Sequence, residues 1–254
     1  MAEFRSAFSK VSEIFGIDDL NGLQKRAIIE FVKGKKDVFI NLPTGFGKSL
    51  IFQALPTVFD EVKEQSGHIV VVVSPLVSLM KDQVSSLRSI GISSVCLSDV
   101  DDDEEASKVE NGEFAVIYGT PESWLTNERW RTMLTYLCDS KKLCAIAIDE
   151  AHVIKQWGTS NNSNKAAFRA CYSKLHELRS LAPDINVIAL TATATNATKN
   201  VIFDVLMMDT PCEIYESPSK ANIAYVVEYM PRDYELEHYF AWLANDLREK
   251  EDRL

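Results

Sequence analysis

The segment from residue 38 to residue 55 constrains the fold more than any other part of the chain. An apolar run, Val-Phe-Ile, is followed by the octapeptide Leu-Pro-Thr-Gly-Phe-Gly-Lys-Ser at residues 42–49, and then by a run that can form a helix. A strand, a glycine-containing loop and a helix in this order form a phosphate cradle, because loop N–H groups and the helix N-terminus point at the anion. Gly45 and Gly47 allow the close backbone approach that such a cradle requires.

The same octapeptide supplies the groups that a nucleotide needs. Lys48 offers a cation to the β- and γ-phosphates, and Ser49 offers a hydroxyl to Mg²⁺. The strict pattern G-x-x-x-x-G-K-[ST] is missed only at its first position, which is Leu42. An ordinary strand, turn and helix is the alternative interpretation, and the rest of the chain must separate the two. The residues expected at the nucleotide are Thr44, Gly45, Phe46, Gly47, Lys48, Ser49 and Leu50.

Apolar runs alternate with helical patterns along the whole chain. The uninterrupted β-branched run at residues 69–73 is typical of a strand that is buried on both faces of a parallel sheet. Such alternation indicates βαβ units, so the predicted fold class is α/β with a mainly parallel sheet of about seven strands in a three-layer arrangement. Strands are expected at residues 37–41, 69–73, 93–97, 114–118, 143–148, 187–190, 213–215 and 223–228.

Helices are expected between and before these strands. Apolar residues spaced by three and four from Phe4 to Phe15 predict an amphipathic helix that ends at Gly16. Two segments, 99–112 and 159–165, are expected to be irregular because they are acidic or uniformly polar. The remaining helices are expected at residues 22–32, 76–87, 124–137, 167–181 and 197–206, and residues 236–254 are expected to form a charged helix or a linker.

A second chemical motif, Asp-Glu-Ala-His at residues 149–152, directly follows the strand predicted at 143–148. A carboxylate there lies at the carboxyl edge of the sheet, from which the phosphate loop also emerges. Asp149 can hold Mg²⁺ beside Ser49, and Glu150 can orient and deprotonate a water aimed at the γ-phosphate. The alternative is a pair of exposed carboxylates that end a strand. The predicted catalytic residues are therefore Lys48, Asp149 and Glu150.

Composition limits the other functions that such a chain can have. The net charge of −10 argues against a generally basic nucleic-acid-binding surface, so any nucleic-acid contact must use a local patch. The five cysteines form no C-x-x-C pair, which predicts that this chain holds no zinc. Because it has neither a signal peptide nor a run of transmembrane length, we expect an intracellular, soluble protein without membrane contact.

The chain resembles the first RecA-like domain of a superfamily 2 helicase and, more closely, the RecQ family of 3′–5′ DNA helicases. The resemblance extends from about Phe15 to about Asn222. Motif Ia together with Gln-Trp-Gly is its most specific part. The segments that carry it are Gln24 upstream of the loop, 43–50 (Walker A), 74–83 (motif Ia), 119–122 (motif Ib), 149–152 with Gln-Trp-Gly at 156–158 (motif II and the aromatic-rich loop) and 189–195 (motif III).

This resemblance implies ATP and Mg²⁺ as cofactors and gives further residues a role. The amide of Gln24 is expected to pair with adenine, since it can satisfy both N6 and N7. His152, Thr191 and Thr193 are expected to couple the nucleotide state to domain closure, with helix capping as the alternative for the threonines. The residues expected to contact DNA are Ser74, Pro75, Lys81, Thr120, Pro121, Gln156, Trp157, Phe168 and Arg169. For the two aromatic residues in this set, Trp157 and Phe168, core packing is the alternative.

The chain also departs from the family pattern. Ile17 and Asn21 stand where the family carries an aromatic residue and an arginine around the adenine, so stacking and cation–π contacts are absent there. Residues 159–167 lengthen the segment between Trp-Gly and Phe-Arg beyond the family norm.

Together these observations predict an ATP-dependent 3′–5′ DNA helicase motor domain that acts on single-stranded or forked DNA in the nucleus. Residues 1–230 are expected to form the domain, with N-terminal helices in 1–33, and 231–254 to begin a linker to an absent second RecA-like domain. Without that domain's arginine fingers, we expect weak ATP hydrolysis and no unwinding. Two alternatives stay open: a nucleotide-gated DNA-binding scaffold, and a DEAH-type RNA helicase, against which motif Ia and Gln-Trp-Gly argue. The oligomeric state is not predicted.

Overall fold

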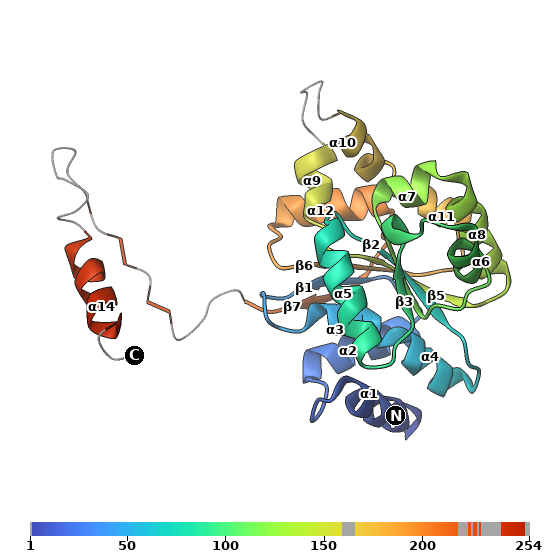
Figure 1. Cartoon of the computed structure of the whole chain (residues 1–254), viewed down its shortest axis with the longest axis horizontal. Coiled ribbons are helices and arrows are strands. Elements are labelled where there is room, and N and C mark those ends of the chain that lie inside the picture. The colour runs from blue at the N-terminus through green and yellow to red at the C-terminus, as the bar shows by residue number, and fades with distance from the viewer. Residues whose placement is uncertain are drawn as a thin grey trace. The chain divides into compact units, whose positions relative to one another are not determined.

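The structure is a computed structural model that describes residues 2–158, 166–217, 223–224, 226–227, 229 and 240–251 (Figure 1). The chain divides into two compact units, Met1–Pro218 and Ser219–Leu254. The first unit contains the sheet and its flanking helices. In the second unit the structure describes one helix, α14 (Ala241–Glu251). Among the described residues, no helix is both long and apolar enough to cross a membrane.

Seven strands form one sheet in the order β3-β4-β2-β5-β6-β1-β7, and every neighbouring pair is parallel. The predicted α/β class and strand number are thereby confirmed. The strands are β1 (Val38–Asn41), β2 (Ile69–Val73), β3 (Ser94–Cys96), β4 (Val116–Gly119), β5 (Leu143–Ile148), β6 (Val187–Thr191) and β7 (Cys212–Tyr215).

Helices cover both faces of the sheet. The helices of the first unit are α1 (Ala2–Phe15), α2 (Gly22–Val32), α3 (Lys48–Gln53), α4 (Leu55–Lys63), α5 (Val77–Ser89), α6 (Asp103–Glu110), α7 (Pro121–Thr126), α8 (Glu128–Asp139), α9 (Val153–Gly158), α10 (Ala166–Ser173), α11 (Glu177–Leu181) and α12 (Asn196–Leu206), together with the 3₁₀ turn η1 (Leu97–Asp99).

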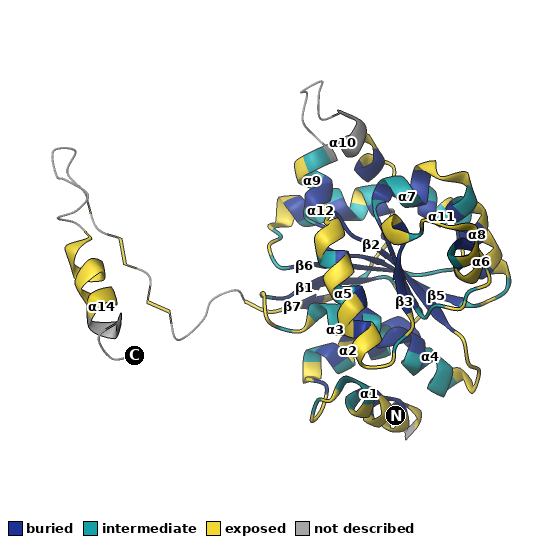
Figure 2. Cartoon of the chain, viewed as in Figure 1, coloured by how far each residue is buried: buried dark blue, intermediate teal, exposed yellow. Residues whose placement is uncertain are grey.

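Two hydrophobic cores account for this three-layer arrangement. One core joins the sheet to α1–α5, and the other joins it to α6–α12. Every residue of β2 and β5 is buried, as their uninterrupted apolar sequences predict for strands covered on both faces. Figure 2 shows the same pattern, with dark blue strands between helices that carry exposed outer faces.

Three of the predicted segments differ from the structure. The helix expected at 124–137 is two helices, because the Asn127 side chain accepts the Arg129 N–H and so starts α8 afresh. The helix expected at 167–181 is likewise divided into α10 and α11. The acidic segment, expected to be irregular, contains α6, which Asp102 caps by accepting the Glu105 N–H at 2.7 Å.

The strand expected at 223–228 is also wrong at the residues that the structure describes. Ile223, Ala224, Val226 and Val227 belong to no strand, and Val227 is 97% exposed. An apolar run alone predicts a strand only where a neighbour can accept its hydrogen bonds. The second segment expected to be irregular, 159–165, lies outside the described residues.

The parallel sheet places its functional segments at one edge. The segments that follow β1, β2, β4, β5 and β6 all emerge where these strands end, and these strands are consecutive neighbours in the sheet. They carry the phosphate loop and the motifs expected to contact DNA, Mg²⁺ and the hydrolytic water. A parallel α/β sheet binds its ligands at this edge.

Candidate nucleotide site

The phosphate loop joins β1 to α3 and depends on its two glycines. Gly45 and Gly47 have φ values of +86° and +72°, which favour glycine. A Cβ atom on Gly47 would lie only 2.6 Å from Nε2 of Gln24, so this position also requires glycine for space. Leu42, the departure from the strict motif, is fully buried in the core, and its N–H donates to the Thr191 carbonyl at 3.2 Å. A large apolar residue at this position therefore anchors the loop.

Lys48 is held inside the loop. Its ammonium donates to the carbonyl oxygens of Leu42 at 3.0 Å and Pro43 at 3.2 Å. Its charge also acts to lower the pKa of Asp149 and of Glu150, although burial makes the net pKa shift of Asp149 upward. Ser49 follows in the first turn of α3 and is partly exposed. The structure thus brings together the groups that the sequence assigned to the phosphates.

Asp149 is a buried carboxylate at the end of β5. It is 5% exposed; its N–H donates to the Val73 carbonyl, and its Oδ1 accepts the Glu150 N–H at 3.0 Å. Burial, and then the charge of Glu150, raise its pKa from 3.8 to about 6, against the opposing effects of that N–H and of Lys48. A cation bound next to this buried carboxylate would stabilise its ionised form.

Glu150 and His152 form a second part of the site. Glu150 has a left-handed backbone, with φ +49°, which a non-glycine residue rarely adopts. Its Oε2 lies 3.1 Å from Nδ1 of His152, and this hydrogen bond lowers the pKa of Glu150. The same His152 nitrogen lies 3.1 Å from the Thr191 hydroxyl, which also accepts the Thr193 N–H at 3.2 Å. Thr193 contributes its backbone here, while its side chain is exposed.

Gln24 contacts the phosphate loop and is only 5% exposed. Its Nε2 donates to the carbonyls of Phe46 at 3.3 Å and Gly47 at 3.2 Å, while its Oε1 accepts the Asn21 N–H at 2.9 Å. The amide must therefore exchange these partners before it can pair with adenine, and its adenine-reading role stays a prediction. Asn21, one of the family departures, caps α2 through its side chain, and Ile17 packs against the core.

The residues expected to contact DNA after β2 are only partly accessible. Ser74 and Pro75 are buried, and the Ser74 N–H donates to the Gly119 carbonyl at 3.1 Å. Lys81 is half exposed and its ammonium lies 2.6 Å from Asp99. Leu76, the residue before α5, is 52% exposed; it lies within motif Ia but is not among the residues expected to contact DNA.

After β4, the expected DNA contacts also serve the fold. The Thr120 hydroxyl caps α7 by accepting the Ser123 N–H at 3.2 Å, and Pro121, the first residue of that helix, is buried. Both residues have a structural reason to be present, and a contact with DNA at this turn stays a prediction.

Trp157 is partly buried in α9, and its ring packs edge-on against Tyr172 of α10, with ring centroids 5.2 Å apart. Its neighbour Gln156 is exposed. The side chains of Phe168 and Arg169 lie outside the described residues. The packing that the sequence offered as an alternative for Trp157 is thus present, and stacking on a base stays a prediction.

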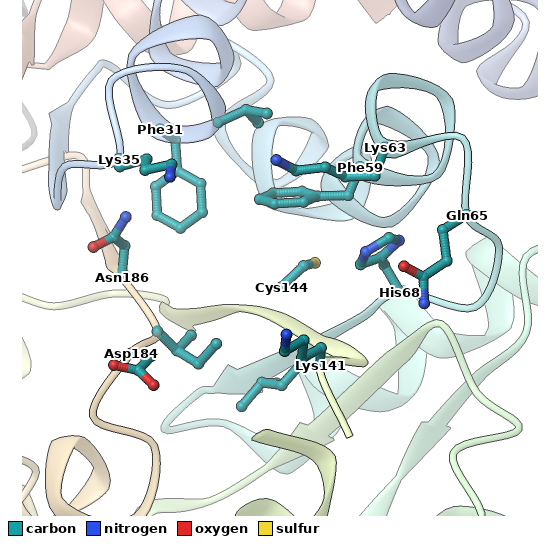
Figure 3. Close-up of a pocket in the computed structure, with 13 residues that line it drawn as sticks. Phe31, Lys35, Phe59, Lys63, Gln65, His68, Lys141, Cys144, Asp184 and Asn186 are labelled. Carbon is teal, nitrogen blue, oxygen red and sulfur yellow. The ribbon is translucent and has the colours of Figure 1, made fainter. Parts of the chain in front are cut away.

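A cavity of about 470 Å³ lies at the opposite edge of the sheet (Figure 3). Its walls come from segments that precede β1, β2, β5 and β6, and they include Lys35, Lys63, Lys141, His68 and Asp184. Helices α2, α4, α8 and α11 end shortly before its lining residues, and Lys35, Lys63 and Lys141 lie at or just beyond the C-termini of the first three, where the helix dipole is negative. The cavity contains none of the predicted site residues, and its position argues against a phosphate site.

Comparison with known proteins supports the helicase assignment. A family model described as "DEAD/DEAH box helicase" matches residues 21–201. The ATP-dependent DNA helicase RecQ of Haemophilus influenzae is 34% identical over 234 residues, which cover 90% of this chain and 35% of that protein. The ATP-dependent helicase SGS1 of Saccharomyces cerevisiae is 33% identical over 223 residues, or 86% of this chain and 15% of that protein. The chain therefore spans about a third or less of the length of these relatives.

A solved structure shares the fold. The DUF1998 helicase MrfA, in a crystal structure bound to DNA, superposes with a TM-score of 0.61 at 18% identity, over 82% of this chain and 29% of that one. The predicted RecA-like architecture is confirmed by this likeness together with the seven-stranded parallel sheet.

Proposed function

Because the chain belongs to the DEAD/DEAH box helicase family, we propose that it is the ATP-binding motor domain of a RecQ-type 3′–5′ DNA helicase. The observation that carries the proposal is that the glycine loop with Lys48 follows β1 and the Asp149–Glu150 pair follows β5, so both emerge at the same edge of one parallel sheet. A phosphate cradle, a cation and an acidic pair at one sheet edge are the parts that phosphoryl transfer requires.

The residues present fit a magnesium ion. The Ser49 hydroxyl and the Asp149 carboxylate are oxygen ligands, which Mg²⁺ prefers. The raised pKa of Asp149 means that the positive charge around it does not offset the cost of burying its ionised form. Bound there, Mg²⁺ would neutralise charge on the phosphates. Lys48 and the loop N–H groups would hold the same phosphates.

Glu150 is the proposed acceptor of the water proton. Its lowered pKa keeps it ionised at neutral pH, and the hydrogen bond to His152 fixes its carboxylate. His152 in turn contacts Thr191 at the end of β6, so a change in the position of Glu150 reaches a neighbouring strand. This contact supports the proposed coupling role of His152, Thr191 and Thr193.

DNA is the proposed substrate, single-stranded or forked, and the expected contacts are those after β2 and β4 and in α9 and α10. The similar RecQ and SGS1 proteins are named as helicases, and MrfA was crystallised with DNA. We also propose that a second RecA-like domain in cis supplies arginine fingers, so that the chain by itself hydrolyses ATP slowly and does not unwind DNA. A nuclear location and a role in DNA repair or recombination belong to the same proposal.

The deciding experiment measures ATP binding and ATP hydrolysis, with and without single-stranded DNA, in the wild type and in Lys48→Ala. We expect Lys48→Ala to lose ATP binding, because the loop then has no cation for the β- and γ-phosphates. Lys108→Ala, which removes an exposed lysine paired with Glu104 on α6, is the matched control and should bind ATP normally. Intact ATP binding by Lys48→Ala would refute the nucleotide site, and clear unwinding by the chain alone would refute its dependence on a second domain.

A further inference from the structure

The Gln24 amide is held in one orientation by partners of opposite kind. Its Nε2 faces two acceptors, the carbonyls of Phe46 at 3.3 Å and Gly47 at 3.2 Å. Its Oε1 faces a donor, the Asn21 N–H, at 2.9 Å. Because a carbonyl only accepts and an N–H only donates, the amide cannot turn over without losing all three hydrogen bonds. The side chain is only 5% exposed, so these partners are not readily replaced by water.

Asn21 and Gln24 also hold each other at the start of α2. The Asn21 side chain accepts the N–H groups of Leu23 at 3.0 Å and of Gln24 at 2.9 Å, while Gln24 accepts the backbone N–H of Asn21. Such a reciprocal pair is a capping box, which satisfies N–H groups that the first turn of a helix leaves without partners. Turning the Gln24 amide towards a ligand would therefore undo half of this box.

The phosphate loop is shaped around the same amide. A Cβ atom on Gly47 would lie only 2.6 Å from Nε2 of Gln24, so the loop backbone approaches the amide more closely than a side chain at this position would allow. Gly47 directly precedes Lys48, the first residue of α3. Gln24 therefore fixes the backbone from which the expected phosphate ligands project.

This arrangement leaves little of the Gln24 amide for a base. Its nitrogen has two hydrogens, one for each loop carbonyl, and its oxygen keeps one lone pair beside the bond from Asn21. Adenine recognition at N6 and N7 takes an acceptor and a donor together, and the donor is in use. A single acceptor meets the amino group of adenine, cytosine or guanine alike. Ile17 and Asn21 have neither an aromatic ring nor a positive charge with which to stack on a base.

We propose that Gln24, locked by Asn21, is a positioning residue of the phosphate loop, and that the site selects nucleoside triphosphates by their phosphates with little preference among bases. This inference rests on the proposed function, because it assumes that the loop binds a triphosphate. It differs from the adenine-reading role that the family resemblance implies for the same amide. The two roles make opposite predictions for a ligand that has phosphates but no base.

The test measures the dissociation constants of ATP, GTP, CTP, UTP and inorganic tripolyphosphate, each with Mg²⁺, by isothermal titration calorimetry on the full chain. The values for the four nucleotides should agree within about fivefold, because a bidentate base contact, which commonly contributes roughly 10–100-fold, is not made.

Gln24→Ala should raise the dissociation constants of all five ligands by the same factor, about tenfold, since two hydrogen bonds that shape the loop are lost. Tripolyphosphate is the decisive ligand. Gln24→Met keeps the length of the side chain without its polar groups; it should match Gln24→Ala, and it serves as the second variant if thermal unfolding shows that the alanine protein does not fold. Gln65→Ala, at an exposed glutamine beside the opposite edge of the sheet, is the matched control and should bind all five ligands as the wild type does.

Two results overturn this inference alone. One is a preference of the wild type for ATP larger than about fivefold. The other is a Gln24 variant that binds ATP more weakly and tripolyphosphate as well as the wild type does, which would assign the amide to adenine. If the wild type binds none of the five ligands, the proposed function fails, and this inference falls with it.

Discussion

At the scale of single residues, the nucleotide site contains a buried carboxylate whose charged form lowers the stability of the folded protein. Asp149 is nearly enclosed beside another carboxylate, and its pKa rises from 3.8 to about 6. The folded protein therefore holds this proton more tightly than the unfolded chain does. The stability that this group contributes is fully present below pH 4 and is lost as the pH rises through about 6, so at neutral pH the charged form opposes folding.

Asp149→Asn should therefore stabilise the metal-free protein at pH 7. The pKa difference corresponds to at most about 3 kcal/mol, and we expect a gain of about 1–2 kcal/mol because the Glu150 N–H loses its charged acceptor. Denaturant unfolding at pH 7 and at pH 4 measures it, and the gain should disappear at the lower pH, where the aspartate is protonated. A destabilised Asp149→Asn at pH 7 would contradict this account.

At the scale of elements, α2 and the phosphate loop form one unit. Gln24, in the first turn of α2, bonds to two carbonyls of the loop, and Gly47 leaves the space that its amide occupies. The loop is therefore shaped by a helix that precedes β1 in the sequence as well as by its own glycines.

Gly47→Ala should weaken ATP binding at least about tenfold, because the added Cβ pushes the Gln24 amide away and the left-handed backbone costs roughly 1–2 kcal/mol. Gly16→Ala is the matched control: it also has a positive φ, of +62°, but nothing lies within 4 Å of its Cβ position. This control should lose a similar amount of stability and keep its ATP affinity. Equal ATP affinities in the two variants would show that the contact with Gln24 is unimportant.

Elements differed in how well the sequence predicted them, for physical reasons. Strands such as β2 and β5 were predictable because burial on both faces requires an uninterrupted apolar run. The break between α7 and α8 at Asn127 was not predictable, because the apolar spacing continues across it and only a side-chain cap divides the two helices. The positions of Lys48 and Asp149 followed from motif spacing, whereas the hydrogen bonds from Gln24 to the phosphate loop connect distant segments and leave no periodic trace.

At the scale of the whole molecule, every described residue of the nucleotide site belongs to the unit Met1–Pro218. In the part of the chain that the structure describes, all seven strands of the sheet and both hydrophobic cores lie within this unit. Its folding and its ATP affinity should accordingly be independent of residues 219–254.

A chain shortened to residues 1–218 should bind Mg-ATP with the affinity of the full chain and unfold at the same temperature. A chain shortened to residues 1–207 lacks β7, leaves one edge of β1 without a partner, and should lose both properties. Calorimetry and thermal unfolding of the three lengths provide the measurement. Loss of ATP binding in the 1–218 chain would mean that the second unit contributes to the site.

The position of β1 in the sheet also has a consequence for how the protein is made. Val38 pairs with Ile188 of β6 on one side and with Cys212 of β7 on the other. The first strand to be synthesised therefore has no sheet partner until the last two strands have been made. Until then the nascent chain carries an apolar segment without partners, the kind of segment that chaperones bind. The phosphate loop can acquire its shape only when synthesis of the unit is nearly finished, so an interrupted translation product should be unable to bind ATP.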